Sequence, residues 1–236
     1  MPIVFKTDNA ASYLNTLYTD GTTTLPSGRK LYRHTTLPGS VLCFNDGVDR
    51  SVLVLDAKYR IGMDDEHLMW GPQEQVTDLY PYGGDMISFE GWETRTDISD
   101  EDINAKSIDP NTSKYNTDTI ITFDFDSTRY KPEAVQHCRK QIIGDNIACD
   151  LPNINTLMRI YVERTYIDKL DPTLEEYPNN SLEKIWTKNG AWSSTERNEK
   201  YAMDVVCMSN QIKIYAMSNY KTNSLCVVPV HELTDL

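Results

Sequence analysis

The sequence has 236 residues, of which 39% are hydrophobic and 25% are charged, with a formal charge of −12 at pH 7 and a pI near 4.7. This length is enough to bury a substantial core in one large domain or two small ones. The negative field disfavours nucleic-acid binding, because no segregated basic patch interrupts it and Arg139-Lys140 is only an isolated basic pair.

The N-terminal segment, residues 1–38, is rich in Thr, Asp, Asn and Gly and has only short apolar pieces. Such a segment gains little by folding alone, so it predicts an extended arm or a short hairpin that docks onto a partner chain. The first residues lack the basic start and apolar core of a secretory signal, and no run approaches the ~18 apolar residues that would span a bilayer. We therefore expect synthesis in a cytoplasm, no signal peptide and no membrane insertion.

The next segment combines strands and loops. Residues 39–44 and 50–56 are β-rich and bracket an Asn-Asp-Gly sequence at 45–47, which predicts a β-hairpin. Residues 62–118 hold Gly, Pro and Asp at short intervals, which is typical of long irregular loops. The acidic run 97–102 fits no known metal-loop spacing, so we interpret it as a solvated loop.

Two helices are predicted in the second half, after a strand at 119–125. The first, over 131–143, opens at Pro132 and stops at Gly144. The second, over 153–168, has Asn153 as its N-cap and an apolar face with helical spacing.

The last fifty residues return to strands. The pattern predicts strands at 191–196, at 201–208, at 211–217 after a Ser209-Asn210 turn, and at 225–230, forming an antiparallel meander on which the two helices pack. The fold class is therefore α+β.

Catalytic and metal-binding motifs are missing from the sequence. The five cysteines form no CxxC pair, and several lie in apolar runs, which indicates buried free thiols. The four histidines are dispersed, and neither a Gly-x-Ser-x-Gly string nor a glycine-rich phosphate loop occurs. We expect no enzyme activity, no metal site and no cofactor.

The order of several short motifs in the second half resembles a known family, the Lcl C-terminal domain family, over about residues 130–233. This family belongs to the C-type-lectin-like fold, together with formylglycine-generating enzymes and the variable receptor-binding proteins of some phages. The sequence departs from the family pattern at Cys149-Asp150, before Leu151-Pro152, and at Val228, where arginine is common. The matching residues are Ala134 and Cys138, Leu151-Pro152-Asn153, Leu157, Trp192-Ser193-Ser194-Thr195-Glu196, Tyr201-Ala202 and Val228-Pro229-Val230.

The resemblance implies a C-type-lectin-like domain over 39–236, with two helices and an antiparallel sheet, preceded by the arm and containing the long loops. The calcium-binding strings of animal lectins are missing, so the scaffold alone does not imply sugar binding. The formylglycine-generating relatives need a reactive cysteine pair. Here Cys207 and Cys226 lie in apolar runs that blunt thiol reactivity.

Two sets of residues are singled out. Trp192, with Ser193, Ser194 and Thr195, is interpreted as structural, because the ring can be buried and the hydroxyls can satisfy backbone groups. In the phage relatives the ligand contacts lie on the late strands and loops, where tyrosine and asparagine suit recognition. The alternative is that the tyrosines and asparagines of this region are ordinary turn and strand residues. The corresponding residues are Tyr215, Asn219, Tyr220 and Asn223, with Asn210 at the neighbouring turn.

These features together favour a bacteriophage virion protein, such as a head-fibre, tail-fibre or decoration protein, assembled in the host cytoplasm. Its arm would contact other virion proteins, its lectin-like face would meet a host surface glycan or protein, and the chain would form a homo-oligomer. The alternative is a bacterial cell-surface adhesin module.

Overall fold

The computed structural model describes residues 20–25, 30–33, 37–43, 51–71, 87–88, 133–143, 147–208 and 213–233. In this part the chain is a mixed α+β structure with antiparallel sheets and three α-helices, in agreement with the predicted fold class. The predicted strand 119–125, most of the loops at 62–118 and the first nineteen residues lie outside the described residues.

Four strands of the N-terminal part and the last described strand form a five-stranded antiparallel sheet, called here the N-terminal sheet. The predicted hairpin is confirmed, since the residues of β3 pair in register with those of β4. Part of the predicted arm also joins this sheet as a hairpin, with β2 pairing with β3. The strand order is β1-β2-β3-β4-β13, with strands β1 (Asp20–Thr24), β2 (Lys30–Arg33), β3 (Gly39–Cys43), β4 (Ser51–Leu55) and β13 (Val230–Leu233).

The two predicted helices are present, with one corrected boundary. Helix α4 (Ile154–Lys169) starts as predicted, because the Asn153 side chain accepts a hydrogen bond from the backbone N–H of Thr156 at 2.8 Å. Helix α3 (Glu133–Lys140) ends before the predicted 143. The isoleucines that follow it form β7 (Ile142–Ile143), which pairs with β8 (Ile147–Ala148), because β-branched residues favour strands. A third helix, α5 (Leu182–Lys188), was not predicted.

The C-terminal sheet has the order β6-β11-β10-β9. Its three long strands follow one another in the chain, as the meander prediction expected, with β11 shifted to later residues than the predicted 211–217. The bounds are β6 (Ile87–Ser88), β9 (Gly190–Glu196), β10 (Tyr201–Met208) and β11 (Lys213–Tyr220).

The predicted strand at 225–230 is wrong as a single element of this sheet. Its start belongs to β12 (Ser224–Leu225), which pairs with β5 (Leu68–Met69), and its end begins β13 on the N-terminal sheet. Between them Val227 pairs with Ile61 in an isolated bridge. Cys226 also bridges Ala191 of β9. The apolar run therefore pairs with several different partners in turn, which gives it a strand-like sequence without one continuous strand.

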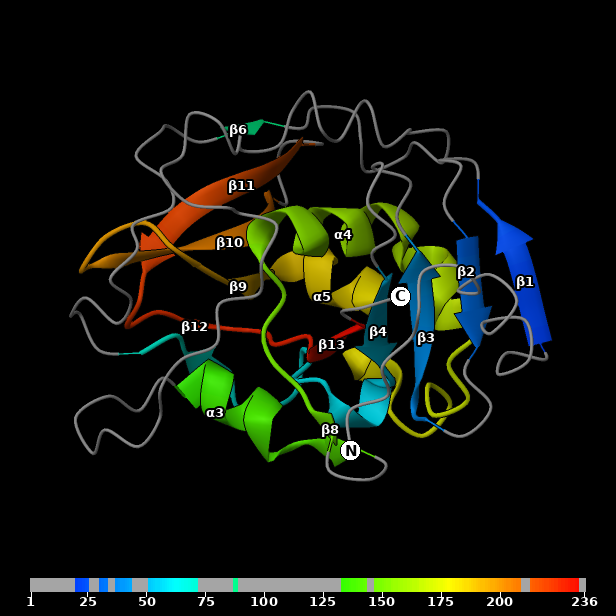
Figure 1. The fold of residues 1–236 in the computed structure, drawn as a ribbon. Helices are drawn as coiled ribbons and strands as arrows, with labels where there is room; N and C mark the ends of the chain where they lie inside the picture. The colour runs from blue at the N-terminus through cyan, green and yellow to red at the C-terminus, as the bar shows by residue number, and fades with distance from the viewer. Residues whose placement is uncertain are drawn as a thin grey trace.

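Helices α4 and α5 lie between the two sheets, as the ribbon shows (Figure 1). Their apolar residues share one core with both sheets, exemplified by Leu42 and Val54 of the N-terminal sheet and by Met203 and Val205 of β10. Burial of these side chains supplies the main stabilisation of the domain. Because β13 pairs with β4, the last described strand closes the domain on its early hairpin.

Helix α3 lies beside β5 and β8 and reaches the opposite face of the C-terminal sheet only through a side-chain cluster. Its buried residues cluster with Trp70, with Trp192 of β9 and with Ala202 of β10. Residues alternate between faces along a strand, so Ala202 points away from Met203, which meets α4 and α5. Of the two predicted helices, α4 packs directly on this sheet, whereas α3 packs on β5 and β8 and shares a cluster with Trp192 and Ala202.

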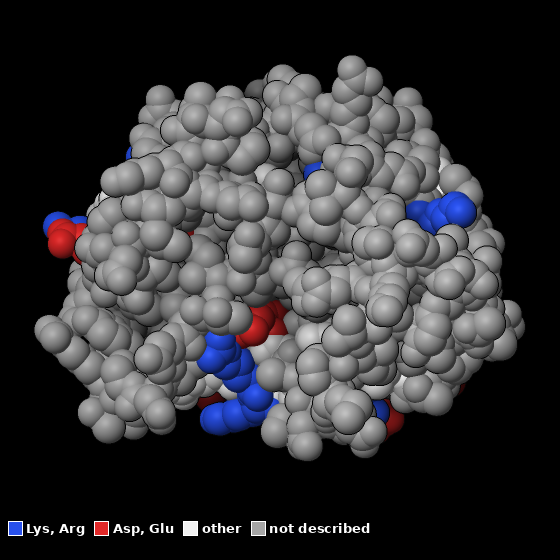
Figure 2. Space-filling view, viewed as in Figure 1, with Lys and Arg blue, Asp and Glu red and all other residues white. Residues whose placement is uncertain are grey.

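On the face seen in Figure 2 the described Lys and Arg groups occur in small separate sets, several of them beside Asp and Glu groups. The described residues on this face form no broad basic surface.

No helix within the described ranges is long and apolar enough to cross a membrane.

Candidate functional site

The predicted recognition residues Asn219, Tyr220 and Asn223 meet at one turn, where β11 ends. The Asn219 carboxamide oxygen accepts hydrogen bonds from the Tyr220 backbone N–H at 3.0 Å and from the Asn223 side chain. The Asn223 backbone N–H donates to the Tyr220 carbonyl at 2.8 Å. These bonds give both asparagines a part in the turn itself, as expected of turn asparagines.

Tyr220 differs from its neighbours in its exposure. Its side chain is 46% exposed, the largest value among the exposed large hydrophobic residues of the described part. The ring lies beside that of Tyr201, the residue opposite it in the β10–β11 register, with centroids 4.5 Å apart and planes inclined by 36°. A hydrogen bond with Tyr220 raises the pKa of the Tyr201 hydroxyl. We call this stacked pair the tyrosine platform.

Arg197 adjoins the tyrosine platform. Its guanidinium donates a hydrogen bond to the hydroxyl of Ser218, two residues before Tyr220 and therefore on the same face of β11. Its backbone N–H donates to the Tyr201 carbonyl at 3.0 Å. The positive charge of Arg197 acts to lower the pKa of Tyr201, in opposition to the hydrogen bond with Tyr220. A cation therefore lies at the edge of the platform.

A buried ion pair supports the turn from beneath. The side chains of Lys221 and Glu196 have no exposed surface, and the Lys221 ammonium binds the Glu196 carboxylate. The same ammonium lies 4.7 Å from the centroid of the Trp70 ring. The Trp70 ring is fixed in turn, because its Nε1–H donates to the Ser193 carbonyl at 2.8 Å. Charge pairing and cation–π attraction thus combine on one ammonium group.

Burial lowers the pKa of Lys221, and the carboxylate of Glu196 counteracts that shift. Ion pairs in a low-dielectric interior are strong only when the partners stay together, because each charge has lost its water. Lys221 also bonds through its backbone, donating to the Lys200 carbonyl at 3.0 Å and accepting from Gly71 at 3.2 Å. The turn is therefore held by both the side chain and the backbone of one residue.

The residues interpreted as structural lie on β9, within the core. Trp192 is fully buried, and its Nε1–H donates to the Leu68 carbonyl at 2.9 Å. The Ser193 hydroxyl donates to the Met203 carbonyl at 2.7 Å. The next two residues connect β9 to the start of α4. Specifically, the Ser194 N–H donates to Pro152 at 2.8 Å, and the Thr195 hydroxyl accepts from the Ile154 N–H at 3.0 Å.

Of the two remaining predicted recognition residues, Tyr215 is not brought to the platform. Tyr215 occupies the β11 position opposite Val206 of β10 and Ser88 of β6. Five residues separate it from Tyr220, which corresponds to about 17 Å along a strand. Asn210 lies outside the described residues.

A buried carboxyl lies on the α3-facing side of the same sheet. Asp204 has no exposed surface, and burial raises its pKa well above the usual range, against a weaker opposing effect of the Asn219 side chain. Neither carboxyl oxygen makes a hydrogen bond of normal geometry with a described group. A neutral, protonated acid is the form that such burial favours.

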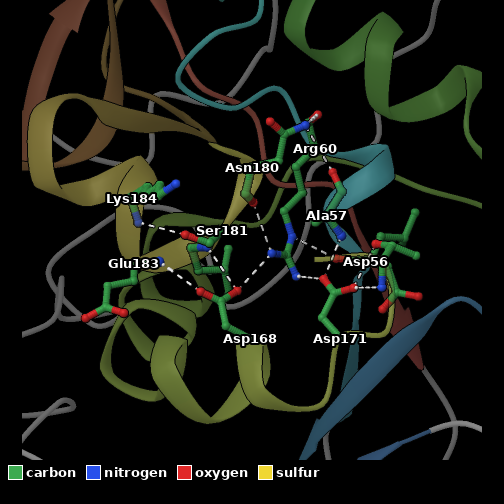
Figure 3. Close-up of polar contacts among 12 residues, drawn as sticks. Asp56, Ala57, Arg60, Asp168, Asp171, Asn180, Ser181, Glu183 and Lys184 are labelled. Carbon is green, nitrogen blue, oxygen red and sulfur yellow. Dashed lines mark hydrogen bonds and ion pairs between the residues drawn. The ribbon is translucent and has the colours of Figure 1, made fainter. Parts of the chain in front are cut away.

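The densest charged cluster of the described chain surrounds Arg60, whose side chain is fully buried after η2 (Ala57–Tyr59). Its guanidinium pairs with Asp168 at 3.1 Å and with Asp171 at 3.2 Å, while Nε donates to the Leu55 carbonyl at 2.9 Å (Figure 3). The two acids come from the end of α4 and from the loop that follows it.

Both acids also accept backbone hydrogen bonds. The Asp168 carboxylate takes the N–H groups of Leu182 and Glu183, at 3.0 and 3.1 Å, at the start of α5 (Figure 3). Asp171 takes the Ala57 N–H at 2.6 Å. Burial raises the pKa of Asp168, and Arg60 opposes this shift. Since these oxygens are engaged by structural donors, we interpret the cluster as a clamp that holds η2, α4 and α5 together.

A thiol, an imidazole and an amide also meet, although the sequence shows them as dispersed. The Cys226 sulfur lies 3.6 Å from His67 Nε2, and the Asn189 amide nitrogen lies 3.3 Å from His67 Nδ1. The Gly62 carbonyl lies 3.1 Å from Nε2, so Nε2 donates to this carbonyl and Nδ1 accepts from the amide. Burial raises the pKa of Cys226 to about 12. This arrangement keeps the thiol protonated and leaves His67 without a lone pair directed at the sulfur.

The described residues contain no group of three or more His, Cys, Asp or Glu side chains arranged to hold a metal ion. Four cysteines are described, Cys43, Cys138, Cys149 and Cys226, and all four are free thiols, as the sequence predicted for the cysteines in general. All but Cys43 are buried. The side chain of Cys207 lies outside the described set.

Sequence reasoning missed Arg197, Tyr201 and Lys221 as parts of the site. Tyr201 starts the strand predicted at 201–208, which is predicted to pair with the strand at 211–217 shortly before Tyr220. This position is the signal that could have pointed to Tyr201. Nothing in the local sequence distinguishes Lys221 from an exposed turn residue.

Comparison with protein-family models, curated proteins and solved structures gives no match for this chain.

Proposed function

We propose that this chain is a non-catalytic recognition protein that binds its ligand at the tyrosine platform. The observation that carries the proposal is the exposed ring of Tyr220, paired with the partly buried ring of Tyr201, on a turn braced by the buried Lys221–Glu196 pair. Tyrosine offers a large amphipathic contact area at low entropic cost. A braced turn has less freedom to lose on binding, which favours affinity.

For the scaffold we propose a C-type-lectin-like fold without its calcium site. The support is the resemblance of residues 130–233 to the Lcl C-terminal domain family, together with two features of the chain. Helix α4 packs on an antiparallel C-terminal sheet, and the buried residues of α3 share a cluster with Trp192 and Ala202 of that sheet, as the resemblance implies. The Trp-Ser-Ser-Thr string forms contacts between β9, β10 and α4.

For the biological setting we propose a bacteriophage virion protein, such as a head-fibre, tail-fibre or decoration protein. Its N-terminal arm would contact other virion proteins, the chain would assemble as a homo-oligomer, and the platform would meet the host surface. The same platform would serve a bacterial cell-surface adhesin, which is the second candidate. Genomic context separates the two, and electron microscopy of particles labelled with an antibody to this chain tests the first directly.

The binding role is tested by Tyr220→Ala, with Tyr177→Ala as a matched control. Tyr177 is also an exposed tyrosine, at 36%, and it lies in the α4–α5 connection, away from β10 and β11. The purified protein is labelled, and its binding to cells of the host bacterium, identified from genomic context, is measured by flow cytometry.

We expect Tyr220→Ala to lose binding while keeping the circular dichroism spectrum and melting temperature, and Tyr177→Ala to bind normally. Undiminished binding by a folded Tyr220→Ala protein would contradict the proposal and direct attention to the long loops of residues 62–118.

A further inference from the structure

The position of Arg197 defines the chemistry of the tyrosine platform. Its guanidinium is held by the Ser218 hydroxyl on the same face of β11 as Tyr220. A guanidinium has five N–H donors, so this single bond leaves most of them available. No described carboxylate forms an ion pair with Arg197, although the whole chain carries a net charge of −12. A cation that pairs with no described carboxylate, beside the exposed ring of Tyr220 and the partly buried ring of Tyr201, is suited to a negatively charged ligand.

The size of the platform limits the class of ligand. Among the described residues the exposed large hydrophobic side chains are Tyr220, Met69 and Tyr177. Met69 lies on β5 opposite Ser224, just after the turn, and only Tyr177 lies elsewhere, in the α4–α5 connection. A stable protein partner would bury about 800 Å² on each side, with several aromatic anchors near the centre. Two rings with centroids 4.5 Å apart instead match the apolar face of one or two sugar rings.

We propose that the tyrosine platform binds a carboxylated saccharide, with the sugar ring on Tyr220 and its carboxylate on Arg197. This inference rests on the proposed recognition function. The Asn223 side chain, exposed at the edge of the same turn, adds a polar group for sugar hydroxyls. No metal is needed in this arrangement, because the guanidinium supplies the positive charge.

Two other charged residues, Glu199 and Lys200, share the β9–β10 connection with Arg197. Glu199 is exposed, and its charge acts on the pKa of Lys221. Lys200 is exposed as well, and its backbone is fixed by the Asn198 side chain at 2.9 Å. Lys200 therefore provides a matched control, since it is a cation of the same connection between β9 and β10.

The test uses the whole chain and beads that display glucuronic acid or N-acetylneuraminic acid, with beads displaying glucose or galactose as neutral probes. We expect binding to the acidic probes that weakens with added salt, as charge pairing at an exposed site requires. Arg197→Gln should weaken this binding about 10- to 100-fold, the range of a charge-assisted hydrogen bond. Lys200→Gln should change it less than about threefold, as expected of a surface charge.

Several results would overturn the inference. Equal binding of acidic and neutral beads, unaltered binding by folded Arg197→Gln, or no binding of either acidic sugar by the unmodified chain would each do so. Capture of a polyglutamate peptide in preference to the acidic sugars would instead assign the site to a protein ligand. If Tyr220→Ala abolishes cell binding while Arg197→Gln does not, the recognition function stands and only the ligand class is wrong.

Discussion

Replacing Lys221 by methionine should destabilise the domain strongly, although Lys221 follows an exposed residue in a surface turn. The change keeps the length of the side chain but leaves the buried Glu196 carboxylate without the ammonium that binds it. Removing one partner of a buried ion pair costs about 3–5 kcal/mol. For a chain of this size, such a loss lowers the melting temperature by about 6–20 °C.

A double-mutant cycle identifies the cause. Glu196→Leu alone should also be destabilising, whereas the double variant Lys221→Met with Glu196→Leu should recover most of the loss, because an apolar pair of similar volume tolerates burial. Lys184→Met is the control, since Lys184 is exposed on α5 and should contribute less than about 1 kcal/mol. The free energy of unfolding is measured in urea. Additive single-variant effects, or a cost below about 1 kcal/mol for Lys221→Met, would refute the reasoning.

Three further outcomes are expected. Asp204→Asn should be more stable than the unmodified protein at neutral pH, and the difference should grow as the pH rises above about 4. Burial raises the pKa of Asp204 in the folded protein above the value in the unfolded chain. The protonated group therefore adds its full contribution to stability below the unfolded-state pKa, and this contribution is lost as the pH rises toward the folded-state pKa. Urea unfolding at pH 5 and pH 8 checks this, and a difference independent of pH would contradict it. Trp192→Ala should cost about 3–5 kcal/mol, since the ring is fully buried. An unchanged melting temperature would be incompatible with that burial. Thermal melts with and without EDTA should coincide, and a large drop with EDTA would reveal a metal site.

The elements that sequence predicted correctly carry local signals. The Asn-Asp-Gly sequence between two β-rich runs specifies the β3–β4 hairpin, and Asn153 before a helical apolar pattern specifies the start of α4. Helix α5 was missed although Ser181 caps it by accepting from the Lys184 N–H at 3.1 Å. This helix is short, and Asp168 at the end of α4 binds its first N–H groups, a contact that only the tertiary structure provides.

The platform depends on a register that the sequence leaves open. A two-residue turn at Ser209-Asn210 would place Tyr201 opposite Ser218, whereas the structure places it opposite Tyr220. A change of two residues keeps every side chain on its face, so the hydrophobic pattern fits both registers equally well. The partner of each tyrosine is therefore fixed by the connection between the strands and by tertiary contacts of the following turn.

Lys221 connects the interior with the recognition surface. Its side chain points into the core, while Tyr220 before it and Thr222 after it are exposed. A hydrophobic side chain at this position could be buried with the turn in many orientations. A buried ammonium group is stable only where it contacts the Glu196 carboxylate and the Trp70 ring. The ion pair thus selects one orientation of the turn and fixes which face Tyr220 presents. The proposed recognition surface therefore has its geometry set before any ligand binds, which reduces the entropy that binding would cost and favours affinity.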